Sequence, residues 1–261
     1  MEQSRLSGLS DQPPVRCAAG AVPELWDAME PLTLVIPTFN EAETIGGVIR
    51  EIPVAYRLDI IVADVGSTDG TQAVAQAAGA RVIDARHGYG RACALGAAAA
   101  HPKSTVIAFM DGDGADRRDL IGEIARPVLD GTYDLVLASR TRGERERGAM
   151  PWHQVFAGRV AGFGIGALYG VKYSDMCAFR AIGRDALQRL GMQEMTYGWN
   201  IEMQMKAARV GLRIREVPPP YRCRGGGSSK VAGSLRGTLQ AGSHITATFC
   251  QVASCGPPLH C

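Results

Sequence analysis

Apolar and polar positions follow two different periods along this chain, and their order predicts an α/β fold. Short apolar, β-branched runs predict strands at 33–37, 59–63, 80–84, 105–110 and 134–138. Segments with a helical period lie between them, at 43–52, 70–78, 89–100 and 118–129. Strands that alternate with helices form right-handed βαβ units, so the first half predicts a mostly parallel central sheet flanked by helices.

The second half of the chain is less regular. Its patterns predict helices at 154–170, 183–190 and 198–210, and strands near 172–179 and at 212–217. A charged loop at 140–147 precedes these elements. We therefore expect one domain over residues 31–230, after a poorly ordered leader at 1–30 and before a tail at 231–261 with one weakly amphipathic helix.

Composition narrows the class of protein. The chain has 261 residues, 46% of them hydrophobic and 21% charged, which is ordinary for a soluble domain with one core. A net charge of +2 gives no reason to expect nucleic acid as a partner. The seven cysteines form no C-x-x-C pair, which argues against zinc and redox sites and favours a reducing cytosol.

Three acidic motifs each close one of the predicted strands. They are IPTFNE at 36–41, ADVGSTDGT at 63–71 and MDGDGAD at 110–116. Ligands of open parallel sheets bind beyond the carboxyl ends of the strands, so these motifs would line one crevice. Carboxylates grouped there favour a divalent cation and an anionic ligand such as a nucleotide diphosphate.

Asp111 and Asp113 are the sharpest metal candidates, because two carboxylates two residues apart can reach one hard cation. Mg²⁺ or Mn²⁺ is the expected ion, since both prefer oxygen ligands. A purely structural interpretation is also open: the segment is an acidic turn between a strand and a helix, and Asp116 or Asp119 caps that helix.

The two other motifs offer binding residues. Asp64 ends an apolar strand, where a carboxylate is costly unless it is paired or used, so we favour a ligand role. Pro37, Asn40 and Glu41 close the first strand; Asn40 could cap the next helix and Glu41 could accept a hydrogen bond from a ribose or base.

Taken in this order and spacing, the motifs resemble those of the family 2 glycosyltransferases, which have a nucleotide-sugar-binding, Rossmann-like fold of GT-A type. The likeness covers roughly residues 32–240 and is strongest to the branch of dolichyl-phosphate mannosyltransferase and its bacterial polyprenyl-phosphate relatives. It also includes the following segments: His87 to Gly90, Ser139-Arg140, Ser174-Asp175, Phe179 to Ile182, Tyr197 to Trp199, Glu202-Met203 and Gly226 to Gly233.

The resemblance implies roles for single residues. Pro37, Asn40, Glu41, Asp64 and Gly88 would bind the donor, and Asp111 and Asp113 the metal on its diphosphate. Arg140 would meet the acceptor or the diphosphate, and Glu202 would face the acceptor side. A loop carrying Arg224, Ser229 and Lys230 would close over phosphate near the membrane.

The chain departs from the family pattern at two positions near the metal. Val65 stands where many members have a second aspartate, and Ala115 stands where the mannosyltransferase branch has a glutamine as a third metal contact. Asp116 is the candidate replacement. These departures leave open how the metal shell is completed and which sugar is transferred.

The implied reaction is an inverting displacement in which a GDP- or UDP-sugar gives its sugar to a polyprenyl phosphate. Such an acceptor is already an anion and needs little or no base, whereas a hydroxyl acceptor would need one, with Glu202 and Asp175 as candidates. Three alternatives stay open: a saccharide acceptor in cell-envelope glycan synthesis, a silent relative that only binds nucleotide-sugar, and a nucleotidyltransferase. The last is disfavoured because IPTFNE contains neither glycine nor lysine.

The sequence also bears on location. Residues 1–30 lack the pattern of a signal peptide, and no run of 18 apolar residues occurs, so we expect a cytoplasmic protein that meets a membrane only at its surface. An amphipathic tail with nearby basic residues would suit the inner face of an anionic membrane.

Overall fold

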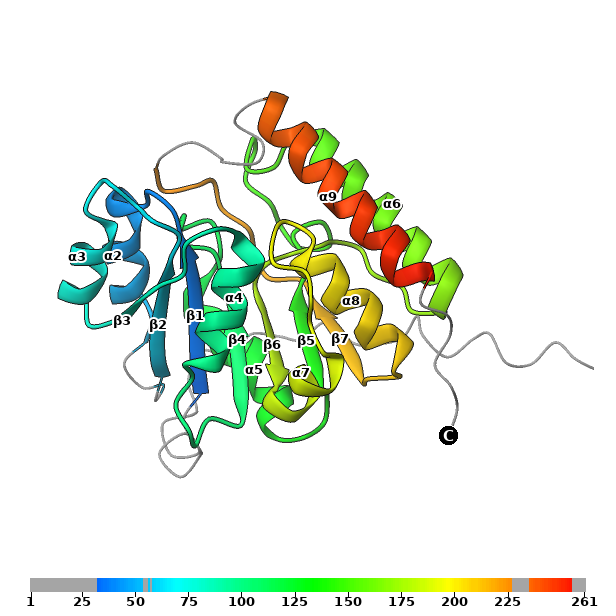
Figure 1. Cartoon of the computed structure of the whole chain (residues 1–261), viewed down its shortest axis with the longest axis horizontal. Helices are drawn as coiled ribbons and strands as arrows, with labels where there is room; N and C mark the ends of the chain where they lie inside the picture. Colours follow the sequence, from blue (N-terminus) through cyan, green and yellow to red (C-terminus); the bar gives the residue numbers. More distant parts are fainter. Residues whose placement is uncertain (1–31, 54–55, 57, 227–234, 255–261) are drawn as a thin grey trace, which may run out of the picture.

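The computed structural model describes residues 32–53, 56, 58–226 and 235–254. Within these ranges the chain forms one seven-stranded sheet between two layers of helices (Figure 1). The strands are β1 Leu32–Thr38, β2 Leu58–Asp64, β3 Arg81–Asp84, β4 Val106–Phe109, β5 Leu135–Ala138, β6 Arg180–Gly183 and β7 Ile214–Val217. The strand order is β3-β2-β1-β4-β6-β5-β7, and every pairing is parallel except the two made by β6. The predicted α/β fold with a mostly parallel sheet is confirmed.

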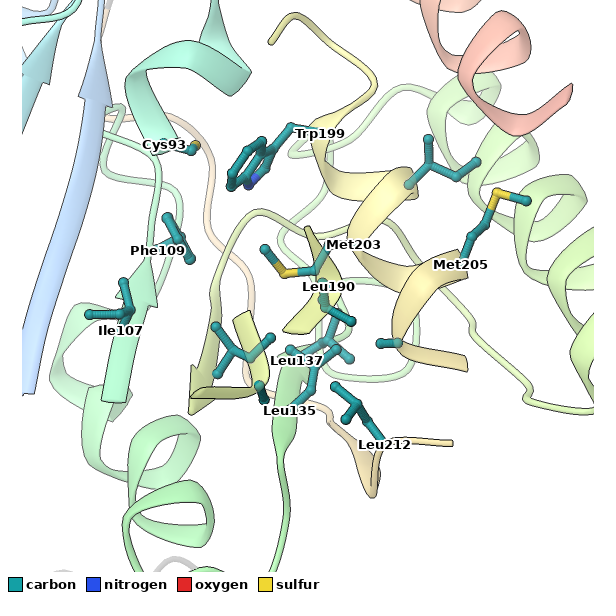
Figure 2. Close-up of a cluster of buried hydrophobic side chains, with 14 of the residues drawn as sticks. Cys93, Ile107, Phe109, Leu135, Leu137, Leu190, Trp199, Met203, Met205 and Leu212 are labelled. Atoms are coloured by element: carbon teal, nitrogen blue, oxygen red, sulfur yellow. The ribbon is translucent and has the colours of Figure 1, made fainter. Parts of the chain in front are cut away.

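The helices cover both faces of this sheet. They are α2 Ala42–Arg50, α3 Thr71–Ala77, α4 Tyr89–Ala98, α5 Ile121–Leu129, α6 Trp152–Tyr169, α7 Arg184–Leu190, α8 Trp199–Arg209 and α9 Leu235–Ser254, with a short 3-10 turn at Arg118–Leu120. Helices α2, α3 and α5 bury apolar residues on one face, while α4, α7 and α8 do so on the other. Figure 2 shows the second cluster, where Trp199 of α8 meets Phe109 of β4 edge-on, with ring centroids 6.2 Å apart.

The strand predicted near 172–179 is wrong. The strand in this region is β6, at Arg180–Gly183, and residues 171–179 are irregular. The reason is that their polar groups bond to side chains rather than to a neighbouring strand: the Ser174 N–H donates to Glu216 at 2.9 Å, and the Asp175 carboxylate accepts from Arg140. The short β6 also enters the sheet antiparallel, between β4 and β5.

Parts of the predicted domain plan lie outside the described residues, namely the leader at 1–30 and both ends of the tail. The described part of the tail is α9, a 20-residue helix. Its buried residues Ala241, Thr248 and Val252 lie on the side that packs against α8. In the described ranges, no helix combines the length and the apolar character needed to cross a membrane.

Candidate active site

The three acidic motifs meet at one edge of the sheet. Strands β2, β1 and β4 are neighbours and run parallel, so their carboxyl ends lie side by side. Hydrogen bonds join the segments that follow them: the Asn40 N–H donates to Ser67 Oγ at 2.8 Å, and Thr44 Oγ1, in the first turn of α2, donates to the Gly112 carbonyl at 2.8 Å. The loops after β1, β2 and β4 therefore form one continuous rim.

Asp64 organises the β2 end of this rim. Its side chain is fully buried and accepts hydrogen bonds from the backbone of Gly66, from both donors of Ser67, and from the side chains of Gln72 and Thr38. Burial raises the pKa of Asp64, but these hydrogen bonds outweigh it and hold the pKa below its ordinary value. Donors from the loop, from β1 and from α3 together offset the cost of burying this carboxylate.

The residues that close β1 lie on the same rim. Pro37 pairs with Ala63 of β2. The pairing of β1 with β4 ends earlier, at Val35, so the missing N–H of Pro37 costs no hydrogen bond to β4. Asn40 has a positive φ of 52° and accepts from the Thr68 N–H at 2.9 Å, which aligns the first two loops. Glu41 is buried and accepts from Thr44 Oγ1. The structure thus brings Pro37, Asn40, Glu41 and Asp64 together, as predicted from the order of the motifs.

A cluster of aspartates occupies the loop after β4. Asp113 and Asp116 are buried, and the Asp111 N–H donates to Asp116 Oδ2 at 3.4 Å. Burial and the Asp113 carboxylate raise the pKa of Asp111 to about 6, and burial with both other aspartates raises that of Asp116. Carboxylates in this position repel one another, and a cation between them would relieve that repulsion.

Two arginines reach the aspartate cluster from distant parts of the chain. Arg224 Nη1 lies 3.0 Å from Asp113 Oδ2, and its Nη2 lies 3.5 Å from Glu41 Oε1. The Gly225 N–H also donates to the Asp113 carbonyl at 2.9 Å, so the segment with Arg224 and Gly225 lies along the loop after β4. The Arg224 Nε is buried and has no hydrogen-bond partner among the described residues.

Arg140 is held by Asp175. Its Nε and Nη2 each donate to the Asp175 carboxylate at 2.7 Å, and its guanidinium stacks over the Tyr221 ring at 5.6 Å. Burial raises the pKa of Asp175, but the arginine outweighs it and holds that pKa below its ordinary value. The charge of Arg140 also lowers the pKa of Asp111, which places it at the edge of the acidic cluster.

The donor set fits a hard divalent cation. Asp111, Asp113 and Asp116 offer carboxylate oxygens on one loop beside a strand end, as Mg²⁺ and Mn²⁺ prefer. Among the residues with assigned positions, no group of three or more His, Cys, Asp or Glu side chains is arranged to hold a metal by itself. A cation here would therefore depend on oxygens from a ligand such as a diphosphate.

Protons compete with a metal at this cluster. Because the pKa of Asp111 is raised to about 6, the carboxylate gains a proton as the pH falls through that value, and a bound cation must displace it. We expect the apparent affinity for Mn²⁺ with a nucleoside diphosphate to be constant above about pH 7 and to fall about tenfold per pH unit below about pH 6. Calorimetric titration between pH 5 and 8 measures this, and a flat profile would contradict it.

The structure gives Gly88 a packing role. Its φ is 120°, and a Cβ at this position would lie 2.4 Å from the Met195 carbonyl oxygen. The adjacent Arg91 N–H donates to that same oxygen at 2.9 Å. Only glycine allows this contact between α4 and the loop before α8, which explains Gly88 without a ligand.

Glu202 lies away from the aspartate cluster. Its carboxylate accepts from the Gln193 and Glu194 N–H groups and pairs with Lys206 at 2.8 Å. It lines a separate cavity of about 280 Å³ between α8 and α9. That Glu202 faces the acceptor side stays a prediction; in the structure, its carboxylate fixes the loop before α8.

A substitution tests this structural role. We expect Glu202→Gln to lower the free energy of unfolding by about 1–2 kcal/mol, because a charged hydrogen-bond acceptor and a buried ion pair are lost. The turnover number should change by less than about twofold, since the carboxylate would not contact substrate. Chemical denaturation and initial-rate assays check both values, and a large fall in turnover with unchanged stability would refute the assignment.

Two of the predicted phosphate-binding residues, Ser229 and Lys230, lie outside the described residues. One contributor was missed: Tyr221, whose ring lies under Arg140. The sequence shows an aromatic residue three positions before Arg224, but its contact with Arg140 can be inferred only when the loop after β7 is known to lie beside Arg140.

The mostly parallel sheet, with an acidic cluster at the carboxyl end of its central strands, has the GT-A type of fold. The model of the family "Glycosyl transferase family 2" matches residues 33–191, and the chain belongs to this family. It is therefore a glycosyltransferase by family, and the nucleotidyltransferase alternative is set aside.

Relatives and solved structures agree with this assignment. An uncharacterised glycosyltransferase of Mycobacterium tuberculosis is 35% identical over 218 residues, which cover 82% of this chain and 95% of that protein. The dolichyl-phosphate hexose transferase of Haloferax volcanii is 33% identical and covers 75% of this chain and 84% of its own. Glucosyl-3-phosphoglycerate synthase from M. tuberculosis, solved with Mn²⁺, UDP-glucose and phosphoglyceric acid, shares the fold with a TM-score of 0.69 at 24% identity, covering 91% of this chain and 84% of that chain.

Proposed function

We propose that this glycosyltransferase moves a sugar from a nucleoside-diphosphate sugar to a polyprenyl phosphate, with Mg²⁺ or Mn²⁺ on the donor diphosphate. The choice of a phosphate acceptor rests on the state of the two residues that could act as a general base. Of the two candidate bases, Asp175 is locked by Arg140 with a lowered pKa, and Glu202 is turned into another cavity. A hydroxyl acceptor needs a base, whereas a phosphate acceptor is already an anion.

The charges around the site also suit an anionic acceptor. Arg140 and Arg224 approach the aspartate cluster from two sides, and a guanidinium binds phosphate oxygens as a planar fork. Arg224 is paired with Asp113 and Glu41 in this structure. The Arg224 guanidinium would be able to bind phosphate when Asp113 held a metal instead.

Named relatives support this class of acceptor. They include the dolichyl-phosphate hexose transferase of Haloferax volcanii and the polyprenol monophosphomannose synthase of Mycolicibacterium smegmatis, the latter 27% identical over 215 residues. The M. tuberculosis synthase with the same fold was solved with Mn²⁺ and UDP-glucose, which supports a nucleotide-sugar donor and a divalent metal here. Its ligand phosphoglyceric acid makes a small phosphorylated acceptor the alternative to test.

In the proposed mechanism, the rim formed by Pro37, Asn40, Glu41 and Asp64 orients the nucleoside. Asp111 and Asp113, with Asp116 behind them, would hold the metal, which when bound stabilises the charge that develops on the departing diphosphate. Arg140 orients the acceptor phosphate for attack on the anomeric carbon, and Asp175 keeps the guanidinium in position. Attack from the opposite side of the leaving group inverts the configuration.

Transfer of radiolabel tests this proposal directly. The full chain is incubated with Mn²⁺ and labelled UDP- or GDP-sugars, and with polyprenyl phosphate, unphosphorylated polyprenol or 3-phosphoglycerate in detergent. We expect organic-extractable label with polyprenyl phosphate and none with polyprenol, because only the phosphate needs no base. Equal transfer to polyprenol, or transfer to 3-phosphoglycerate alone, would overturn the proposed acceptor.

A further inference from the structure

Helix α6 exposes an unusual row of large apolar side chains. Trp152 and Phe163 are 79% and 80% exposed, and Phe156 and Val160 are also exposed. Their spacing of four, four and three residues places all four on one face of the helix. We call these four residues the α6 apolar face.

The opposite side of α6 is built from small residues. Gly158, Ala161, Gly162 and Ile165 are buried, and a Cβ at Gly162 would lie 2.0 Å from the Tyr173 carbonyl oxygen. A Cβ at Gly164 would lie 2.7 Å from the Phe249 ring, so α6 also contacts α9, and Figure 1 shows the two helices side by side at the edge of the molecule. A helix that is mostly apolar around its circumference is typical of a buried or lipid-contacting helix, and the described residues that cover α6 leave Trp152, Phe156, Val160 and Phe163 exposed.

The charges of this region favour an anionic partner. Neither α6 nor α9 contains an aspartate or glutamate, although the chain has 26 such residues. From Arg142 to Lys172 there are five basic and two acidic residues, and Arg145, Arg159 and Lys172 are exposed. A lipid leaflet rich in anionic headgroups matches both the aromatic side chains and the positive charge.

The α6 apolar face also lies close to the candidate active site. A Cβ at Gly158, on the inner side of the helix, would lie 3.5 Å from Asp175 Oδ1, and Asp175 holds Arg140. The apolar face is therefore separated from this ion pair by about one helix diameter, about 10–12 Å. A phosphate at the surface of a leaflet in contact with α6 would be near Arg140.

We infer that the α6 apolar face docks the enzyme on the surface of an anionic membrane, where it meets its lipid acceptor. The inference rests on the proposed polyprenyl-phosphate acceptor, and it assigns the membrane contact to α6 rather than to the tail. Helix α9 buries Ala241, Thr248 and Val252 and presents one large exposed apolar residue, Leu239, among its described side chains. The contact is peripheral, because α6 lies along the surface with one face in the headgroup region.

Flotation of the full chain with lipid vesicles tests the inference. We expect binding to vesicles of phosphatidylethanolamine and phosphatidylglycerol, weaker binding to phosphatidylcholine alone, and a loss of about tenfold or more in partitioning for Phe156→Glu/Phe163→Glu. The matched control is Gln76→Glu/Gln188→Glu, which adds the same two charges at exposed positions on α3 and α7 and should bind as the parent does.

Activity assays separate this inference from the proposed function. The Phe156→Glu/Phe163→Glu variant should lose transfer to vesicle-embedded polyprenyl phosphate but keep transfer to a short-chain, water-soluble analogue. Transfer to polyprenyl phosphate without any vesicle binding would overturn the inference and leave the proposed function intact. Vesicle binding without transfer would overturn the proposed function and leave the membrane contact of α6 intact. A dimer in solution that this variant dissociates would assign the face to a second copy and also overturn the inference.

Discussion

Asp113→Asn should reduce the rate of sugar transfer at saturating donor by about a thousandfold or more. Asparagine has the same shape and can still accept the Ala115 N–H bond made at 2.9 Å, which should keep the loop in its conformation, while the ion pair with Arg224 is lost. The variant lacks the negative charge that would hold a divalent cation on the donor diphosphate. Loss of that electrostatic stabilisation costs about 4 kcal/mol in the transition state, which corresponds to about a thousandfold in rate.

Two measurements and one control variant test this prediction. Initial rates give the loss of activity, and a thermal shift with nucleoside diphosphate and Mn²⁺ should disappear in the variant, because a ligand that binds the folded state raises its melting temperature. The control is Asp119→Asn, six residues downstream, whose ion pair with Arg117 is partly exposed and should matter little. A variant that keeps its Mn²⁺-dependent thermal shift and transfers sugar within tenfold of the parent rate would show that Asp113 does not hold the metal.

The local part of this site was predictable from the sequence because it depends on strand ends. Each acidic motif follows an apolar run, and the parallel order of β2, β1 and β4 then places the motifs side by side. The contact of Arg224 with Asp113 was not predictable from residue patterns, because it joins loops far apart along the chain. Only the resemblance pointed to that region.

The errors have physical causes as well. The four-residue β6 is too short to show a period, and the polar residues before it bond to side chains, so the predicted strand fell too early. The acceptor-side role of Glu202 came from the resemblance alone, and no sequence pattern predicted its bonds to the loop before α8. The α6 apolar face could not be predicted from the sequence, because a helix with apolar residues on every side has no pattern that distinguishes its buried face from its exposed face.

Breaking the Arg140–Asp175 pair should have the largest effect on stability. We expect Asp175→Asn to lower the free energy of unfolding by about 3 kcal/mol, since the buried carboxylate accepts both donors of the arginine fork and its loss leaves a guanidinium without its counter-charge. For a domain of this size, the melting temperature should fall by about 6–12 °C. Turnover should fall as well, because Arg140 would no longer be held in position.

The pH dependence and a control pair separate this interaction from a general surface effect. The pKa of Asp175 is lowered in the folded state, so its contribution is complete at neutral pH and is lost as the pH falls below about 4, where the parent and the variant should converge in stability. The control is Asp84→Asn, which breaks the exposed pair with Arg86 and should cost less than about 1 kcal/mol. Denaturation curves at pH 7 and at a series of pH values below about 4 check both expectations. If Asp175→Asn were no more destabilising than Asp84→Asn at pH 7, the pair would not be what holds Arg140 beside the aspartate cluster.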